Sequence, residues 1–146
     1  MTSAKEFREK FLDSYRMARE SHRDEWDAIW TDTARWSNLM IYDPGSVVKS
    51  VAEGLHLKCH QREPLSFDAV FVKPTNPPWD WFPVVVAIEH ENNPKTFDGE
   101  VKKLLSIRCR LKVGITYVLS SDTGDADALR TKIASNIQNQ FGTIKG

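Results

Sequence analysis

The sequence predicts an α/β domain in which helices flank a mixed β-sheet of four to five strands. Stretches with apolar residues at every third or fourth position, the helical period, alternate with short apolar or alternating runs, which are typical of strands. Clusters rich in Pro, Gly, Asn and Asp separate these stretches. The length of 146 residues and the hydrophobic fraction of 40% suit one domain with a single core.

The N-terminal third of the chain is predicted to be helical. A long helix over residues 4–30 places one apolar stripe on its surface, formed by Phe7, Phe11, Tyr15, Ala18, His22, Trp26 and Ile29. A second, short helical piece is predicted at 34–42. Asp43 can then cap a third helix, and Pro44 can occupy its first turn, where a missing N–H costs nothing. Gly54 is expected to end this helix.

Four strands are predicted, at 55–61, 67–72, 82–91 and 112–119. The first alternates between apolar and polar residues, whereas the third and fourth are apolar on both sides, which indicates burial on both faces. Short connections join the first three, so these should form an antiparallel meander, although the loop at 73–81 carries three prolines. A helix at 97–110 should cross over and bring the fourth strand back parallel to the third. A last helix is predicted at 126–140.

The composition favours an intracellular, cytoplasmic protein. The 20 basic and 20 acidic residues balance, so no strong overall field indicates a nucleic-acid or membrane partner. Cys59 and Cys109 are too few for a disulfide framework, which favours a reducing compartment. The first residues lack the apolar core of a signal peptide. No apolar run approaches the ~20 residues that a membrane span requires, so no membrane partner is expected.

Acidic side chains gather at the end of the third predicted strand. Glu89 and Glu91 are two positions apart and point to one face of the sheet, whereas His90 points to the other. In a meander the start of the second strand lies beside the end of the third, so Asp68 should come level with them. Carboxylates held together repel unless one keeps a proton or they share a cation. Mg²⁺ prefers such oxygen ligands, and a metal-bound water is a nucleophile.

These residues resemble the signature of the PD-(D/E)XK nuclease superfamily, which is an Asp followed, after a spacer, by Glu-x-Lys at the end of the next strand. The matching segments are Ser66-Phe67-Asp68 and Ile88-Glu89-His90-Glu91. The predicted order of elements is similar to that superfamily's three-layer α-β-α core, the restriction-endonuclease-like fold. The resemblance covers about residues 43–119. It implies a single domain over 1–146, with a helical N-terminal extension at 1–42 and a C-terminal helix at 120–146.

Carried over by position, the resemblance implies that Asp68 and Glu89 are ligands of a Mg²⁺ or Mn²⁺ ion. Glu91 stands where the family usually has lysine, so it is either a general base or a ligand to metal. In other members the following helix supplies the lysine, and Lys102 and Lys103 lie on that helix here. Glu91 and these two lysines are therefore the candidates for positioning water.

The resemblance also implies a hydrolase that cleaves phosphodiester bonds in nucleic acid, with DNA as the expected substrate. The family often adds an acidic residue from the helix before the first strand, and Glu53 is the candidate, with Glu63 as second choice. A homodimer is a further hypothesis, because cutting two strands commonly uses two subunits and the N-terminal helix offers aromatic surface.

Two other interpretations remain open. The protein can be a relative that has lost catalysis and binds nucleic acid or a protein partner, since the motif lysine is missing. Alternatively, Glu89 and Glu91 form structural ion pairs with Lys102, Lys103 or Arg108, and Asp68 simply ends a turn.

The tryptophans have two interpretations each. Trp26 and Trp30, one helical turn apart, are expected to serve the core or a dimer contact rather than to stack on bases. Trp79 and Trp81, in the proline-rich loop, either stack on bases or fold back as a lid.

Overall fold

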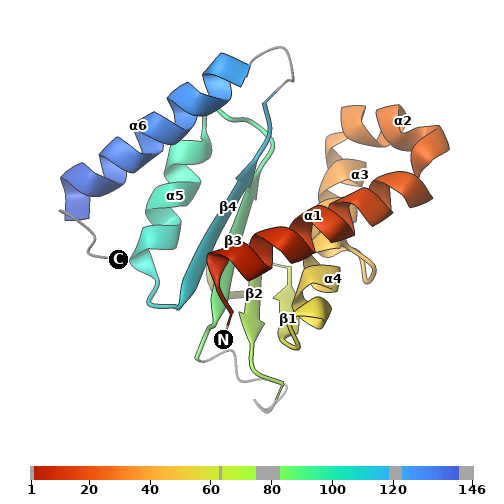
Figure 1. Ribbon diagram of the computed structural model, residues 1–146, viewed down its shortest axis with the longest axis horizontal. Helices are drawn as coiled ribbons and strands as arrows, with labels where there is room; N and C mark the ends of the chain where they lie inside the picture. Colours follow the sequence, from red (N-terminus) through yellow and green to blue (C-terminus); the bar gives the residue numbers. More distant parts are fainter. Residues whose placement is uncertain (1, 63, 75–82, 119–122, 142–146) are drawn as a thin grey trace.

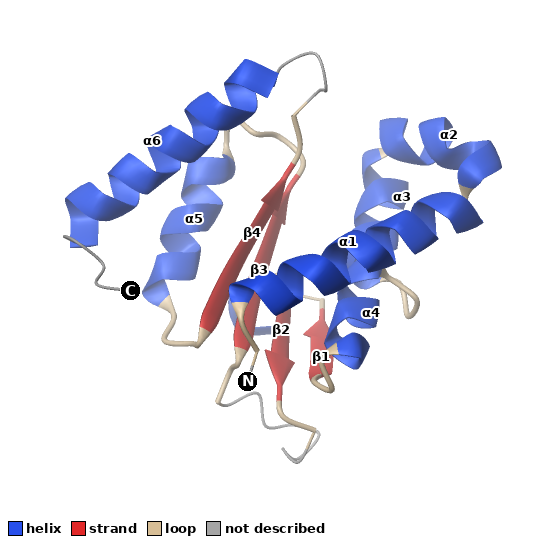
Figure 2. Ribbon diagram, in the orientation of Figure 1, coloured by secondary structure: helices blue, strands red, loops and turns tan. Residues whose placement is uncertain are grey.

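The computed structural model describes residues 2–62, 64–74, 83–118 and 123–141 (Figure 1). Four strands form one mixed sheet with helices on both faces (Figure 2). The strands, in the order in which they lie side by side, are β1 (Lys58–Gln61), β2 (Ala69–Val72), β3 (Val86–Glu91) and β4 (Leu111–Thr116). The α/β class and the mixed sheet are therefore confirmed.

The sheet has the predicted connectivity. β1 pairs antiparallel with β2, and β2 pairs antiparallel with β3, which is the meander expected from the sequence. β4 pairs parallel with β3 after a helical crossover. Three strands start later than predicted. At β1 the reason is local, because Leu55 caps the preceding helix and His56 adopts a positive φ of 56° in the turn that follows.

The N-terminal helices cover one face of the sheet. They are α1 (Ala4–Ser21), α2 (Trp26–Thr31), α3 (Thr33–Ser37) and α4 (Val47–Gly54). The single helix predicted over 4–30 is wrong, because α1 ends at His22 and a 3₁₀ turn over Arg23–Glu25 intervenes. This break lets Trp26 pack edge-on against Tyr15 and Trp36, with ring centroids 5.6 and 5.3 Å apart.

The start of α4 also differs from the prediction. A π-helical turn over Asn38–Tyr42 follows α3, and Asp43 and Pro44 lie in the turn after it. The residue that caps α4 is Ser46, whose hydroxyl accepts a hydrogen bond from the Lys49 N–H at 3.2 Å. Ser46 is fully buried, and its hydroxyl also contacts the Gln61 side-chain amide of β1 at 2.9 Å. The cap therefore fixes α4 to the edge strand.

Two helices lie on the other face. Figure 1 shows α5 (Phe97–Ser106) against the sheet and α6 (Thr123–Phe141) outside α5. α5 ends earlier than the predicted residue 110, because Ile107 is extended and leads into β4. Lys132 of α6 bonds to Asp98 of α5 at 3.0 Å, which ties the two helices together.

Alternation along the strands creates a core on each face. Phe71, Val86 and Ile88 point toward the N-terminal helices, where they pack with Trp36 and Met40. The intervening positions, which include Val70 and Ala87, point toward α5 and pack with Leu104 of that helix. In the described part of the chain, no helix combines the length and apolar character needed to cross a membrane.

Candidate functional site

Asp68 and Glu89 lie side by side at one end of the sheet. Ala69 pairs with Ile88 in the antiparallel register, so the residue before β2 stands beside the residue after Ile88. The sequence predicted this proximity from the meander alone. The negative charge of Asp68 adds to the rise in the pKa of Glu89, whose largest cause is burial.

Hydrogen bonds from two sides hold the Asp68 carboxylate. The Tyr42 hydroxyl donates to Oδ1 at 2.9 Å, and the backbone N–H of His90 donates to Oδ2 at 2.8 Å. Tyr42 comes from the π-helical turn, so the N-terminal segment contributes directly to the orientation of this side chain. Each carboxylate oxygen keeps a lone pair for a further partner.

Glu89 points toward α5, on the face of the sheet away from the N-terminal helices. Glu89 is only 1% exposed, and the Lys103 ammonium lies 2.6 Å from its carboxyl oxygen Oε1. Lys103 also lies 3.7 Å from a carboxylate oxygen of Glu100, one helical turn earlier, and 5.5 Å from the centre of the Phe67 ring. The sequence predicts both Lys102 and Lys103 on this helix, and its pattern does not distinguish which of them contacts Glu89.

Burial dominates the electrostatics of Glu89 and raises its pKa from 4.5 to about 8. The hydrogen bond with Lys103 opposes this rise in pKa, whereas a hydrogen bond with Glu100 and the charge of Asp68 add to it. Burial alone would lower the pKa of Lys103, but the three acidic neighbours raise it instead. Lys103 therefore stays charged near neutral pH.

The cluster contains more acidic groups than one lysine can balance. Asp68, Glu89 and Glu100 supply three carboxyls, and Lys103 is the cation that contacts two of them. A hard divalent ion fits an oxygen-rich site with this excess of acid. As the side chains stand, however, the described residues hold no group of three His, Cys, Asp or Glu side chains that could hold a metal ion. Lys103 is the group that balances Glu89 in this arrangement.

The structure places the other predicted site residues away from Glu89. The Glu91 carboxylate accepts a hydrogen bond from the Asn93 N–H at 2.8 Å and so closes the turn after β3. Lys102 lines a crevice between α5 and α6 on the far side of the helix. Glu53 is exposed on α4, where its charge acts on Cys59 in β1. Glu63 lies outside the described residues.

His90 points to the N-terminal helices, as the alternation of side chains predicted. Its Nε2 lies 2.9 Å from the Tyr117 hydroxyl, and the two rings pack edge-on. Burial lowers the pKa of His90 to about 4, against the opposing charges of Asp68 and Glu91. His90 is therefore neutral at physiological pH and links Asp68, through its backbone, to Tyr117, through its ring.

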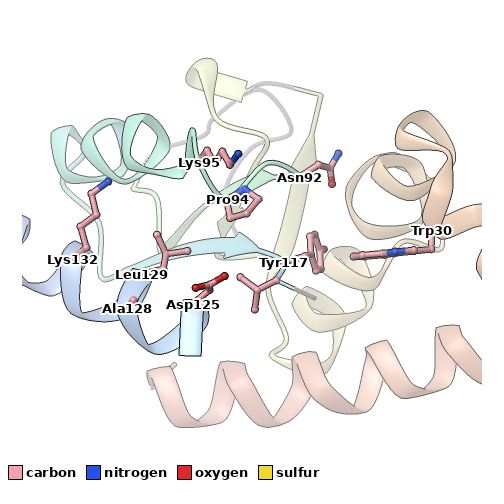
Figure 3. A pocket seen from close by; sticks show the side chains of 10 residues that line it. Trp30, Asn92, Pro94, Lys95, Tyr117, Asp125, Ala128, Leu129 and Lys132 are labelled. Atoms are coloured by element: carbon pink, nitrogen blue, oxygen red, sulfur yellow. The ribbon is translucent and has the colours of Figure 1, made fainter. Parts of the chain in front are cut away.

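A pocket of about 620 Å³ opens beyond the carboxyl ends of β3 and β4 (Figure 3). Its walls come from α2, the segment after β3, the segment after β4 and α6, and the lining residues are Trp30, Asn92, Pro94, Lys95, Tyr117, Val118, Asp125, Ala128, Leu129 and Lys132. Sequence patterns do not predict this pocket, because its walls are far apart in the chain. Trp30 packs on Trp36 at 4.6 Å, as expected of a core residue, but remains 38% exposed. Trp79 and Trp81 lie outside the described residues.

Comparison with known proteins does not assign a family. No protein-family model matches the chain, and neither the curated proteins nor the solved structures gave a significant match.

Proposed function

We propose that this protein is a metal-dependent nuclease of the PD-(D/E)XK type. One observation carries the proposal: Asp68 and Glu89 lie side by side at the end of the meander, and Lys103 reaches Glu89 from the crossover helix. The order α4–β1–β2–β3–α5–β4 supports it, because it is the order that the resemblance implies for a restriction-endonuclease-like core.

Each residue of the cluster has a role in this proposal. Asp68 and Glu89 would hold Mg²⁺ or Mn²⁺, which when bound neutralises phosphoryl charge and activates water. The hydrogen bonds from Tyr42 and the His90 N–H hold the Asp68 carboxylate in one orientation, as a metal ligand requires. Lys103 takes the part of the missing motif lysine, because its ammonium can donate to an anionic phosphate and favours the ionised form of Glu89.

The substrate class of this proposal comes from the resemblance to the nuclease superfamily. We propose DNA as the nucleic acid and the reducing cytoplasm as the setting, where the free thiols of Cys59 and Cys109 are stable. The proposal also includes a homodimer, which remains a hypothesis. The balanced charge predicts modest affinity for DNA that weakens with salt.

The test is cleavage of plasmid and of single-stranded DNA in Mg²⁺ or Mn²⁺, with EDTA as the blank. Asp68→Asn should reduce the rate by about 100-fold or more, and Tyr42→Phe by about tenfold, because one removes a ligand and the other only its orientation. Lys103→Met should also abolish most cleavage. Lys102→Met is the matched control, since it changes the neighbouring residue on the face toward α6 and should cut like wild type.

Two outcomes would overturn the assignment. Cleavage by Asp68→Asn at the wild-type rate would place the activity elsewhere or in a contaminant. Equal loss in Lys102→Met and Lys103→Met would show that the effect is general loss of positive charge rather than the contact with Glu89.

A second candidate is a nuclease-fold module that binds without cutting. The contact between Lys103 and Glu89 favours it, because the ammonium balances the buried carboxyl without a metal. This candidate predicts no cleavage with either metal, and no gain of cleavage in Glu91→Lys. In that case Lys103→Met would change only the stability of the protein, measured by urea unfolding.

A further inference from the structure

The pocket beside Trp30 has the size and position of a ligand site. Its volume of about 620 Å³ lies within the range of small-molecule sites, roughly 300–1,000 Å³. It opens where β3 and β4, the parallel pair, reach their carboxyl ends, which is where open α/β sheets bind ligands.

The walls suit a flat, aromatic ligand. Trp30 and Tyr117 form one side, with their rings nearly perpendicular at 86° and their centroids 5.4 Å apart. Figure 3 shows Ala128 and Leu129 of α6 facing them across the opening. A planar ring can therefore contact the partly exposed Trp30 and Tyr117 rings on one side of the pocket and apolar side chains of α6 on the other.

The rim suits an anion attached to that ring. Two lysines and one acid, Lys95, Lys132 and Asp125, line the pocket. Lys132 bonds to Asp98, whereas Lys95 is exposed and makes no salt bridge within the described residues. Lys95 is thus the cation available for a phosphate, which favours a nucleotide over a neutral or cationic aromatic compound.

The pocket is continuous with the strand that carries the candidate site. Asn92 follows Glu91 directly, and at about 3.3 Å per residue the pocket begins roughly 10 Å from Glu89. Tyr117 in the pocket wall contacts His90, whose N–H holds Asp68. A nucleic acid bound at this end of the sheet can therefore place one of its bases in the pocket.

We propose that this pocket binds one unpaired base of a single-stranded nucleic acid, stacked on Trp30 with its phosphate near Lys95. The proposal rests on the proposed nuclease function and names its substrate as a single strand or a locally unpaired segment. Bases in a duplex are excluded, because a base must leave its stack to enter such a pocket.

The test measures fluorescence anisotropy of labelled ten-nucleotide probes in EDTA, so that no metal or cleavage is involved. Deoxyadenylate and riboadenylate probes separate DNA from RNA, a duplex tests the need for unpaired bases, and an abasic strand keeps the phosphates without the rings. Wild type should bind the single strands about tenfold tighter than the abasic strand and tighter than the duplex.

Three variants locate the contact. Trp30→Ala should weaken single-strand binding about tenfold, with circular dichroism confirming that it folds. Ala128→Phe fills the pocket from an exposed helix position and should have the same effect without removing a core contact. Ala134→Phe, at another exposed position of α6, is the matched control and should bind like wild type.

The proposal is overturned if the abasic strand binds as tightly as the others, or if Trp30→Ala and Ala128→Phe bind like wild type. Its failure differs from failure of the nuclease proposal. If cleavage occurs but the pocket variants do not change it, the nuclease proposal stands and the pocket proposal fails. If the protein binds single strands through the pocket but does not cleave them in Mg²⁺ or Mn²⁺, the pocket proposal stands and the nuclease proposal fails.

Discussion

At the scale of single residues, the candidate site consists of Asp68, Glu89 and Lys103, and different features of the fold bring them together. The alternation of β3 and the meander fix Asp68 beside Glu89 whatever the details of packing. Lys102 and Lys103 are adjacent on α5, and both faces of this helix are covered, one by the sheet and one by α6. Apolar periodicity therefore could not show which lysine faces Glu89.

Glu91 shows a second limit of the sequence pattern. Strand alternation predicts that Glu91 points to the same face of the sheet as Glu89. However, β3 ends at Glu91, and the Glu91 carboxylate accepts a hydrogen bond from the Asn93 N–H in the following turn. Side-chain capping of a turn is decided by the local backbone, which periodicity does not report.

The buried Glu89 predicts an unusual dependence of stability on pH in metal-free protein. Its pKa of about 8 lies above the ordinary 4.5, so its stabilising contribution is complete at low pH and is lost as pH rises through 8. His90, with its pKa lowered from 6.5 to about 4, acts in the opposite direction below pH 6.5. The free energy of unfolding should therefore fall by about 2 kcal/mol between pH 6.5 and 8, above the range in which His90 titrates.

Urea unfolding in EDTA at several pH values measures this fall. Glu89→Gln should remove most of it, and Glu91→Gln, on the same strand but only half-buried, should keep it. A wild-type free energy of unfolding that is constant from pH 6.5 to 8 would rule out a buried, protonated Glu89.

At the scale of elements, the close approach of α5 to β4 positions Lys103. Gly114 pairs with Glu89 across the parallel strands, and a Cβ built on it would lie 2.5 Å from the Phe97 ring of α5. Phe97 is buried, so the ring has little room to move. The absence of a side chain at Gly114 therefore allows the helix to lie directly over the acidic cluster.

Gly114→Ala should lower the free energy of unfolding by about 1–3 kcal/mol, because the added methyl group overpacks this contact. Gly99 is the control: it lies in α5 with nothing within 4 Å of a built Cβ. Gly99→Ala should raise stability by about 0.5–1 kcal/mol through helix propensity. Thermal or urea unfolding measures both, and equal effects of the two changes would contradict the close packing at Gly114.

The elements themselves were largely predictable, whereas their ends were not. Apolar periodicity located every strand and most helices, because burial of one face determines both. It joined α1 to α2 across His22, since the helical period continues through the break and the aromatic packing that causes it is tertiary. The cap at Ser46 was missed for a similar reason: its hydroxyl is held by Gln61, far along the chain.

At the scale of the whole molecule, the N-terminal helices belong to the core of the sheet. Phe7 of α1 packs on Phe71 of β2, with ring centroids 6.2 Å apart. Trp36 packs edge-on against Tyr117. The Tyr42 hydroxyl donates a hydrogen bond to Asp68. One side of the sheet thus orients Asp68, and the other side, through α5, supplies Lys103. The candidate site is formed where these two layers meet the end of the meander.

The central claim is that this acidic cluster is a cation site, and Mn²⁺ binding tests it most directly. Electron paramagnetic resonance of free Mn²⁺, with protein above pH 8 so that Glu89 is ionised, measures the bound ion. Wild type should bind Mn²⁺ at least about tenfold more tightly than Asp68→Asn or Glu89→Gln. Glu53→Gln, at an exposed position of α4, should bind like wild type. No binding by wild type at millimolar Mn²⁺, or equal binding by all four proteins, would contradict this account.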